Sequence, residues 1–190
     1  NDDIKKANGL VKEYPEEIIV LNLLGVSYER KGLLKDASRA YKDALKLNPN
    51  IPEMNFNLGA ILFSENKVEE AIHLYKKAIQ LNNNFPEAHF NLGIALQSGG
   101  GYDEAIQCYQ KAIQIQPGFF EAITNIGTIR QLQGQLEEAE EFFKKSLSIR
   151  EDGRGHYNLA NVLRNQGNLS LSISHYRKAI ELGSGEAEFY

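Results

Sequence analysis

Apolar side chains recur along this chain at the period of an α-helix, in segments separated by short polar turns. Leu21, Leu24 and Tyr28 are spaced three and four residues apart, which places them on one face of a helix. Each such segment stops near a glycine or an asparagine, the residues that most readily adopt the left-handed conformation after a helix end. These stops are Gly32, Asn66, Gly100, Gly134 and Gly167.

The segment after each stop predicts a second helix with opposite charges at its two ends. It begins with acids, such as Glu69 and Glu70, and ends with bases, such as Lys76 and Lys77. This order suits the helix macrodipole, whose amino end favours negative charge and whose carboxyl end favours positive charge. The chain is therefore predicted to be all-α and built from antiparallel helix pairs, with the charged faces of the second helices in solvent.

The helix pairs repeat at intervals of thirty-four residues, with one final step of thirty-three. Neither helix of a pair can bury its apolar stripe alone, so the repeats are expected to stack into a solenoid. A single array over 1–190 is predicted, with a partial second helix at 1–17 and the start of a truncated repeat at 187–190. The five repeats between them are 18–51, 52–85, 86–119, 120–152 and 153–186.

Small and aromatic residues share this spacing. Glycine inside a helix costs about 1 kcal/mol relative to alanine, so its recurrence at one place indicates close approach of two helices. We expect Gly25 to face Ala37 of the second helix, with Tyr41 filling the next gap. The matching glycines are Gly59, Gly93 and Gly127, and the matching aromatic residues are Tyr75, Tyr109 and Phe143.

Taken in order, these residues resemble the tetratricopeptide repeat (TPR) family. The family pattern W-x2-L-G-x2-Y, A-x3-F, A, P is met by Leu24, Gly25, Tyr28, Ala37, Tyr41, Ala44 and Pro49, without the tryptophan. The repeats are most similar to the superhelical TPR arm of O-linked N-acetylglucosamine transferase. This resemblance implies a right-handed superhelix with a concave groove that receives a protein partner.

An asparagine occupies the sixth position of four repeats, on the side of the first helix opposite its packed stripe. The resemblance implies that this side lines the groove, where we expect the amides to lie in water. An amide both donates and accepts hydrogen bonds, so it can bind the backbone of an extended peptide; alternatively, it only solvates the groove. The asparagine ladder is Asn57, Asn91, Asn125 and Asn158; Asn22, Phe56, Phe90 and Asn161 are further predicted groove residues.

Composition narrows the choice of partner and compartment. A net charge of −4 and a pI near 5.6 disfavour nucleic acid and anionic membranes as partners. No apolar run is long enough to predict a membrane span. Cys108 is the only cysteine, which excludes an internal disulfide framework and favours a cytoplasmic location. Met54 is the only methionine, and the chain is expected to be a piece of a longer protein.

No set of residues along the chain predicts catalysis or a cofactor. The histidines His73, His89, His156 and His175 lack metal-ligand spacing. The sequence therefore predicts a non-catalytic interaction scaffold. The alternative is the substrate-targeting arm of a larger enzyme, such as a glycosyltransferase, with its catalytic domain outside the chain. Self-association through the ends is a third hypothesis, because Ile173, Ile180 and Leu182 are expected to be uncovered.

Overall fold

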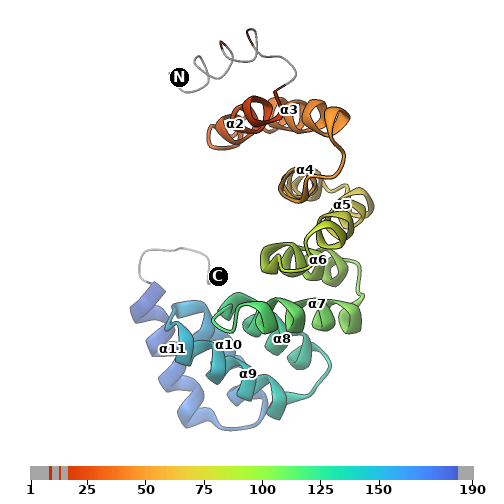
Figure 1. Cartoon of the computed structure of the whole chain (residues 1–190). Helices are drawn as coiled ribbons and strands as arrows, with labels where there is room; N and C mark the ends of the chain where they lie inside the picture. The colour runs from red at the N-terminus through yellow and green to blue at the C-terminus, as the bar shows by residue number, and fades with distance from the viewer. Residues whose placement is uncertain (1–8, 10–12, 14–16, 184–190) are drawn as a thin grey trace. The chain divides into compact units, whose positions relative to one another are not determined.

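The computed structural model describes residues 9, 13 and 17–183, so the partial repeats predicted at 1–17 and 187–190 lie almost wholly outside the description. The described residues form ten α-helices and no strand (Figure 1). The all-α prediction is confirmed. The helices are α2 (Ile18–Glu29), α3 (Leu34–Leu47), α4 (Pro52–Ser64), α5 (Val68–Leu81), α6 (Pro86–Ser98), α7 (Tyr102–Ile115), α8 (Phe120–Leu132), α9 (Leu136–Ile149), α10 (Gly153–Asn165) and α11 (Leu169–Gly183).

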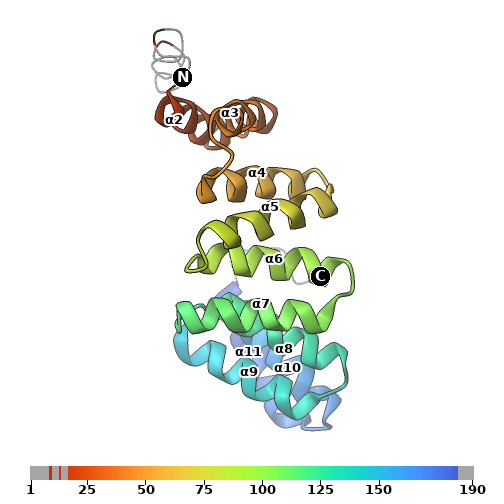
Figure 2. The same ribbon diagram turned by 45° about the vertical axis from the view of Figure 1, so that its right-hand side comes forward.

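The chain divides into two compact units, Asn1–Gly100 and Gly101–Tyr190. In the first unit α2 packs against α3 and α4 packs against α5, while α3 contacts α4 and α5 contacts α6 (Figure 2). In the second unit each helix from α7 to α11 packs against the next one. Each unit is therefore a stack of helix pairs. The division into five repeats and the handedness of a superhelix stay predictions.

Local signals in the sequence account for several helix ends. Pro52 and Pro86 stand in the first turn of α4 and α6, where the missing backbone N–H is not needed. The carboxylate of Asp152 accepts a hydrogen bond from the Gly155 N–H at 2.6 Å and so caps the start of α10.

All five predicted stops adopt the left-handed conformation. The four glycines have φ between 70° and 83°, and Asn66 has φ of 61°. This conformation is strained for most side chains but open to glycine and tolerated by asparagine. The turns within the pairs are thereby confirmed.

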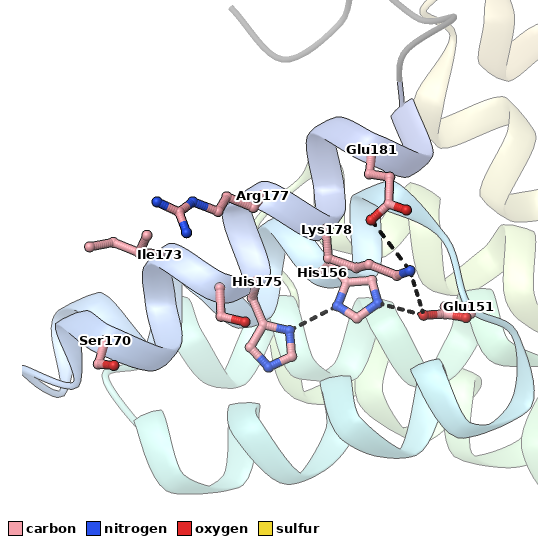
Figure 3. A pocket seen from close by; sticks show the side chains of 9 residues that line it. Glu151, His156, Ser170, Ile173, His175, Arg177, Lys178 and Glu181 are labelled. Carbon is pink, nitrogen blue, oxygen red and sulfur yellow. Dashed lines mark hydrogen bonds and ion pairs between the residues drawn. The ribbon is translucent and has the colours of Figure 1, made fainter.

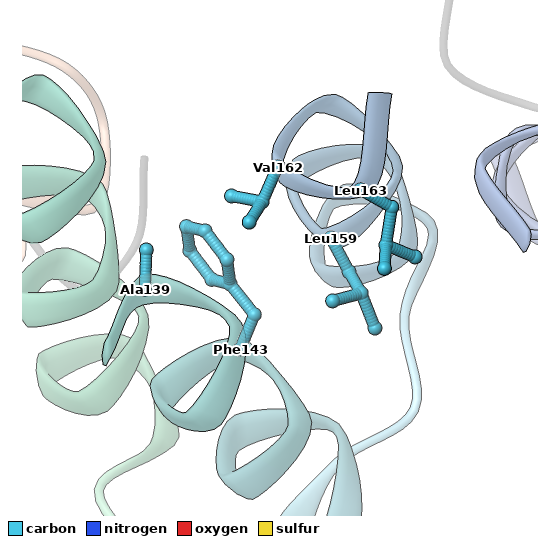
Figure 4. Close-up of a cluster of buried hydrophobic side chains, with 5 residues drawn as sticks. All are labelled: Ala139, Phe143, Leu159, Val162 and Leu163. Carbon is cyan, nitrogen blue, oxygen red and sulfur yellow. The ribbon is translucent and has the colours of Figure 1, made fainter. Parts of the chain in front are cut away.

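The repeating small and aromatic residues are buried, and some of them pack against the next helix pair. In the second unit, Ala139 and Phe143 of α9 pack against α10 in a buried cluster completed by Leu159, Val162 and Leu163 (Figure 4). Phe143 has no exposed surface, and the same holds for the matching Tyr41 and Tyr109. This burial confirms the predicted packed stripe.

The close approach at the glycines is confirmed, but the expected partner is wrong. A Cβ built on Gly127 would lie 2.9 Å from Cε1 of Phe143, and one on Gly59 would lie 3.0 Å from Cε1 of Tyr75. The glycine therefore faces the ring of the aromatic residue, and not the alanine expected from the sequence. Ring atoms lie so near the bare backbone that a side chain at Gly127 would collide with them.

The outer face of α11 is apolar and uncovered in the described part of the chain. Ile173, Ile180 and Leu182 are 52%, 66% and 42% exposed, which confirms that expectation. Whatever residues 184–190 contribute to this face lies outside the description. Among the described residues, no helix has both the length and the apolar character needed to cross a membrane.

Candidate functional site

The four asparagines of the ladder lie at one place on successive first helices. Asn57 is on α4, Asn91 on α6, Asn125 on α8 and Asn158 on α10. Each is half-buried, whereas the following leucine or isoleucine of the packed stripe, such as Leu58, is buried. Within the first unit α4 contacts α6, and within the second α8 contacts α10. Each unit therefore carries two ladder asparagines on neighbouring first helices.

One ladder amide is hydrogen-bonded to a tyrosine of the preceding second helix. Asn57 Nδ2 donates to Tyr41 Oη at 3.3 Å. Asn91 and Asn125 lie near the matching Tyr75 and Tyr109, and each lowers the pKa of its tyrosine. The expectation that the amides lie in water is therefore wrong for Asn57. The sequence places the tyrosine and the asparagine sixteen residues apart in all three pairs.

The tyrosine hydroxyls of these pairs are neutral and serve as hydrogen-bond partners. Burial raises the pKa of Tyr75 and of Tyr109 to about 12, and the bond from the asparagine lowers it in part. Burial also raises the pKa of Tyr41, as do its hydrogen bond to Glu29 and the negative charge of that carboxylate. At Tyr41 the amide N–H of Asn57 is the donor.

The fourth asparagine lacks this partner. The residue matching the tyrosines is Phe143, which has no hydroxyl. No hydrogen bond joins the side chain of Asn158 to another residue in the described part of the chain. Asn57 is thus the ladder amide with a hydrogen bond to a tyrosine hydroxyl, whereas no hydroxyl stands at the matching place beside Asn158.

The other predicted groove residues are divided between packing and polar contacts. Phe56 is half-buried, with its ring centroid 4.9 Å from Phe85 and 5.9 Å from Tyr75, so it packs between helices. Phe90 is half-buried on α6. Asn161 accepts a hydrogen bond from Tyr176 Oη at 2.6 Å. Asn22 is half-buried, and its Oδ1 is buried without a hydrogen bond to another described residue. Their role in binding stays a prediction.

In two repeats, the side chain at the fourth position, where the TPR pattern has tryptophan, contacts a backbone carbonyl of the loop before the helix. Asn55 Nδ2 donates to the carbonyl oxygens of Pro49 at 3.1 Å and Ile51 at 2.7 Å. His89 Nε2 lies 3.2 Å from the carbonyl oxygen of Asn83, which matches Pro49 in the repeat. An amide and a polar ring thus join these two loops to the helices that follow them. The sequence analysis missed this role.

Two histidines meet between α10 and α11 in a hollow of about 700 Å³ (Figure 3). His156 Nδ1 lies 2.8 Å from His175 Nδ1, and the two rings are stacked. On its other side, His156 Nε2 lies 3.3 Å from Glu151 Oε1. Spacing along the chain does not indicate this pair, because it depends on how the two antiparallel helices align.

The folded protein disfavours the charged form of His175. Burial lowers the pKa of His175, and the positive charges of His156 and Lys144 lower it further. No group of three or more histidine, cysteine, aspartate or glutamate side chains in the described residues could hold a metal ion. The pair is therefore a titrating contact between the last two described helices.

Acidification is expected to weaken the packing of α11. In the unfolded chain His175 takes up its proton near pH 6.5, but the folded protein resists it until lower pH. Below about pH 6.5 the unfolded state therefore binds more protons than the folded state. The contribution of His175 to stability is complete above about pH 6.5 and is lost as the pH decreases through the pKa of the folded state. Denaturant unfolding between about pH 7.5 and 5 should show a shallower loss for His175→Gln than for the unchanged chain.

The control for this experiment is His73→Gln, because His73 is exposed on α5. It should leave the pH dependence as it is in the unchanged chain. Equal pH dependence in all three proteins would show that the histidine pair does not contribute.

The stacked helix pairs define a helical-repeat solenoid. Models described as "TPR repeat" match residues 59–100, and models described as "Tetratricopeptide repeat" match 18–51, 86–119 and 119–184. The chain belongs to the tetratricopeptide repeat family. Members of this family are in general non-catalytic interaction scaffolds.

Solved structures agree on the fold, whereas no curated protein matches the chain. MamA is 26% identical with a TM-score of 0.78, over 87% of this chain and 98% of MamA. PilF of Pseudomonas aeruginosa is 21% identical with a TM-score of 0.80, over 87% of this chain and 76% of that one. YrrB, a TPR protein with an unusual peptide-binding site, is 19% identical with a TM-score of 0.75, over 95% and 93%. The resemblance to the glycosyltransferase arm stays a prediction.

Proposed function

We propose that the chain is a non-catalytic scaffold that binds an extended peptide or partner segment along the asparagine ladder. The observation that carries this proposal is the recurrence of a half-buried asparagine at one place on four successive first helices. Asn57 directs its N–H to the Tyr41 hydroxyl, which leaves its amide oxygen to accept a hydrogen bond from a backbone N–H of a ligand.

The spacing of the ladder suits an extended chain. Helices in contact lie about 8–10 Å apart, and α4 contacts α6 as α8 contacts α10. An extended peptide rises about 3.3 Å per residue, so two ladder asparagines of one unit span about three peptide residues. Backbone contacts of this kind bind peptides with little dependence on their side chains.

The comparisons and the charge favour a protein partner. YrrB, which shares the fold, has a peptide-binding site. The net charge of −4 disfavours nucleic acid. We propose as the alternative a second setting for the same surface, in which the chain is the substrate-targeting arm of a larger enzyme, such as a glycosyltransferase.

The proposal is tested by finding a peptide and locating where it binds. Peptides selected from a displayed random library on the purified chain would be titrated into ¹⁵N-labelled protein. The side-chain amide signals of the ladder are expected to shift, whereas those of the exposed Asn50, Asn84, Asn165 and Asn168 should stay in place.

Two results would contradict the proposal. One is a set of shifts confined to the outer faces of α5 and α9. The other is that the chain selects no peptide and instead associates with itself through α11, so that its size increases with concentration.

A further inference from the structure

We propose that α11 is the surface through which two copies of this chain bind each other, with their α11 helices packed antiparallel about a two-fold axis. The contact uses four residues of α11 that we call the seam: Leu169, Ile173, Tyr176 and Ile180. The seam contains no residue of the asparagine ladder. Self-association through it is therefore independent of peptide binding, and either can hold without the other.

The matching face of α9 shows what this face of a second helix does. The residues thirty-three positions before the seam are Leu136, Glu140, Phe143 and Leu147. Leu136 and Leu147 pack against the buried cluster that Phe143 forms with α10 (Figure 4). Glu140 Oε2 accepts a hydrogen bond at 2.9 Å from Gln166 Nε2 of α10. All four positions on α9 thus meet one helix, so this face packs against a helix.

On α11 the same face is more apolar and is uncovered in the described part of the chain. Leu169, Ile173 and Ile180 are 60%, 52% and 66% exposed. Phe143 has no exposed surface, whereas Tyr176 at the matching place is half-buried. The side of α11 toward α10 carries instead the buried Ser172, whose hydroxyl donates to a carbonyl oxygen of α10. Covering the seam with another helix would remove this apolar surface from water, which favours association.

The spacing of the seam makes it complementary to itself. Its residues follow one another at intervals of four, three and four, the spacing of apolar positions that face a partner helix in a coiled coil. This order is the same from either end, so two antiparallel copies match at every position. Leu169 then lies opposite the second copy's Ile180, and Ile173 lies opposite its Tyr176. A two-fold contact requires such a self-complementary surface.

Charge beside the seam favours the antiparallel orientation. Arg177 is exposed on the edge of the seam, one turn beyond Ile173. Parallel helices would place the two Arg177 side chains next to each other, and such like charges repel. Antiparallel helices instead place each Arg177 near the second copy's Ser170, which is uncharged.

The size of the contact sets its strength. A helix of 15 residues is about 22 Å long, so one helix pair buries less than the roughly 1,200 Å² of a stable interface. We therefore expect a weak dimer, with a Kd of about 10–100 µM. Because a two-fold contact uses the same surface on both copies, association stops at two.

The first measurement is the average mass of the full chain by sedimentation equilibrium between about 5 µM and 1 mM, a range that spans this Kd. The mass is expected to rise from one copy toward two and no further. Ile173→Glu and Ile180→Glu should each weaken association by at least about 10-fold, because they place a charge in an apolar contact. The matched control is Leu171→Glu, since Leu171 is 50% exposed on the same helix but outside the seam; it should leave association unchanged.

The second measurement determines the orientation of the two helices by disulfide formation, in a chain with Cys108→Ala so that no other thiol is present. The double variant Leu169→Cys with Ile180→Cys should oxidise to a covalent dimer, since these positions lie opposite each other in the antiparallel pair. Either single variant should stay uncrosslinked. Its two thiols would lie about 16 Å apart along the helix axis, whereas the Cα atoms of a disulfide lie within about 7 Å.

Three results would overturn this inference. The first is a mass of one copy at every concentration; if Ile173→Glu then also lowers the melting temperature, a segment of the same chain outside the description covers the seam. The second is association that Ile173→Glu and Ile180→Glu leave intact, which would place the contact elsewhere. The third is a covalent dimer of the single cysteine variants, which would show parallel helices. Whether a peptide shifts the ladder signals is judged separately, in the Ile173→Glu variant, and decides the proposed function alone.

Discussion

Replacing Gly127 with leucine is expected to lower the free energy of unfolding by about 1–3 kcal/mol, the usual effect of overpacking a buried site. A Cβ at this place would lie 2.9 Å from Cε1 of Phe143 and 3.2 Å from Cβ of Phe142. The Phe143 ring is fully buried and packs against α10, so it cannot move aside without disturbing a second helix. Denaturant unfolding followed by circular dichroism would measure the loss.

Gly118→Leu is the matched control, because a Cβ there meets nothing within 4 Å and Gly118 is exposed. Its effect should stay within about 0.5 kcal/mol, as for other surface substitutions. The double variant with Phe143→Ala should be more stable than the sum of the two single losses predicts, since removing the ring relieves the collision. Equal unfolding curves for the leucine variants at 127 and 118 would refute the close approach.

The sequence predicts the helix pairs well because the information is local. Helical period, turn residues and end charges each act within a few residues, and the stops at Gly32 and Asn66 adopt the conformation that their residue types favour. Which residue the repeating glycine contacts is not determined by such local signals. The period of one helix gives its buried face, but the rotation and shift of the neighbouring helix decide which side chain meets that face. The sequence predicts that the glycine faces the alanine, whereas in the structure it faces the aromatic ring.

The candidate site shows the same limit. The placement of Asn57 away from the packed stripe follows from its own helix, and its half-burial agrees with it. Its bond to Tyr41 joins α4 to α3, and no helical period links residues on different helices. The contact of His156 with His175 was missed for the same reason. A constant separation of sixteen residues between tyrosine and asparagine was the one signal available in the sequence.

Changing Asn57, Asn91, Asn125 and Asn158 together to alanine is expected to abolish most peptide binding while changing stability little. Each lost hydrogen bond to a ligand backbone is worth about 1 kcal/mol net. If the four losses add, binding weakens by several hundred-fold, since every 1.4 kcal/mol is a factor of ten. The measurement is a calorimetric titration of the display-selected peptide.

Stability changes little because two effects oppose each other. The variant loses the amide bond from Asn57 to Tyr41, worth about 0.5–1.5 kcal/mol. Against this loss, alanine is a better helix former than asparagine by about 0.5 kcal/mol at each of four places. The melting curve should therefore stay close to that of the unchanged chain, so that weak binding is not a result of unfolding.

A control with the same chemical change removes four asparagines outside the ladder. Asn50, Asn84, Asn165 and Asn168 are all exposed, and replacing them with alanine should leave the affinity for the peptide unchanged. The two fourfold variants then differ only in where the amides were removed. If the ladder variant melts much earlier yet binds the peptide as the control does, the asparagines serve the fold and the peptide binds elsewhere.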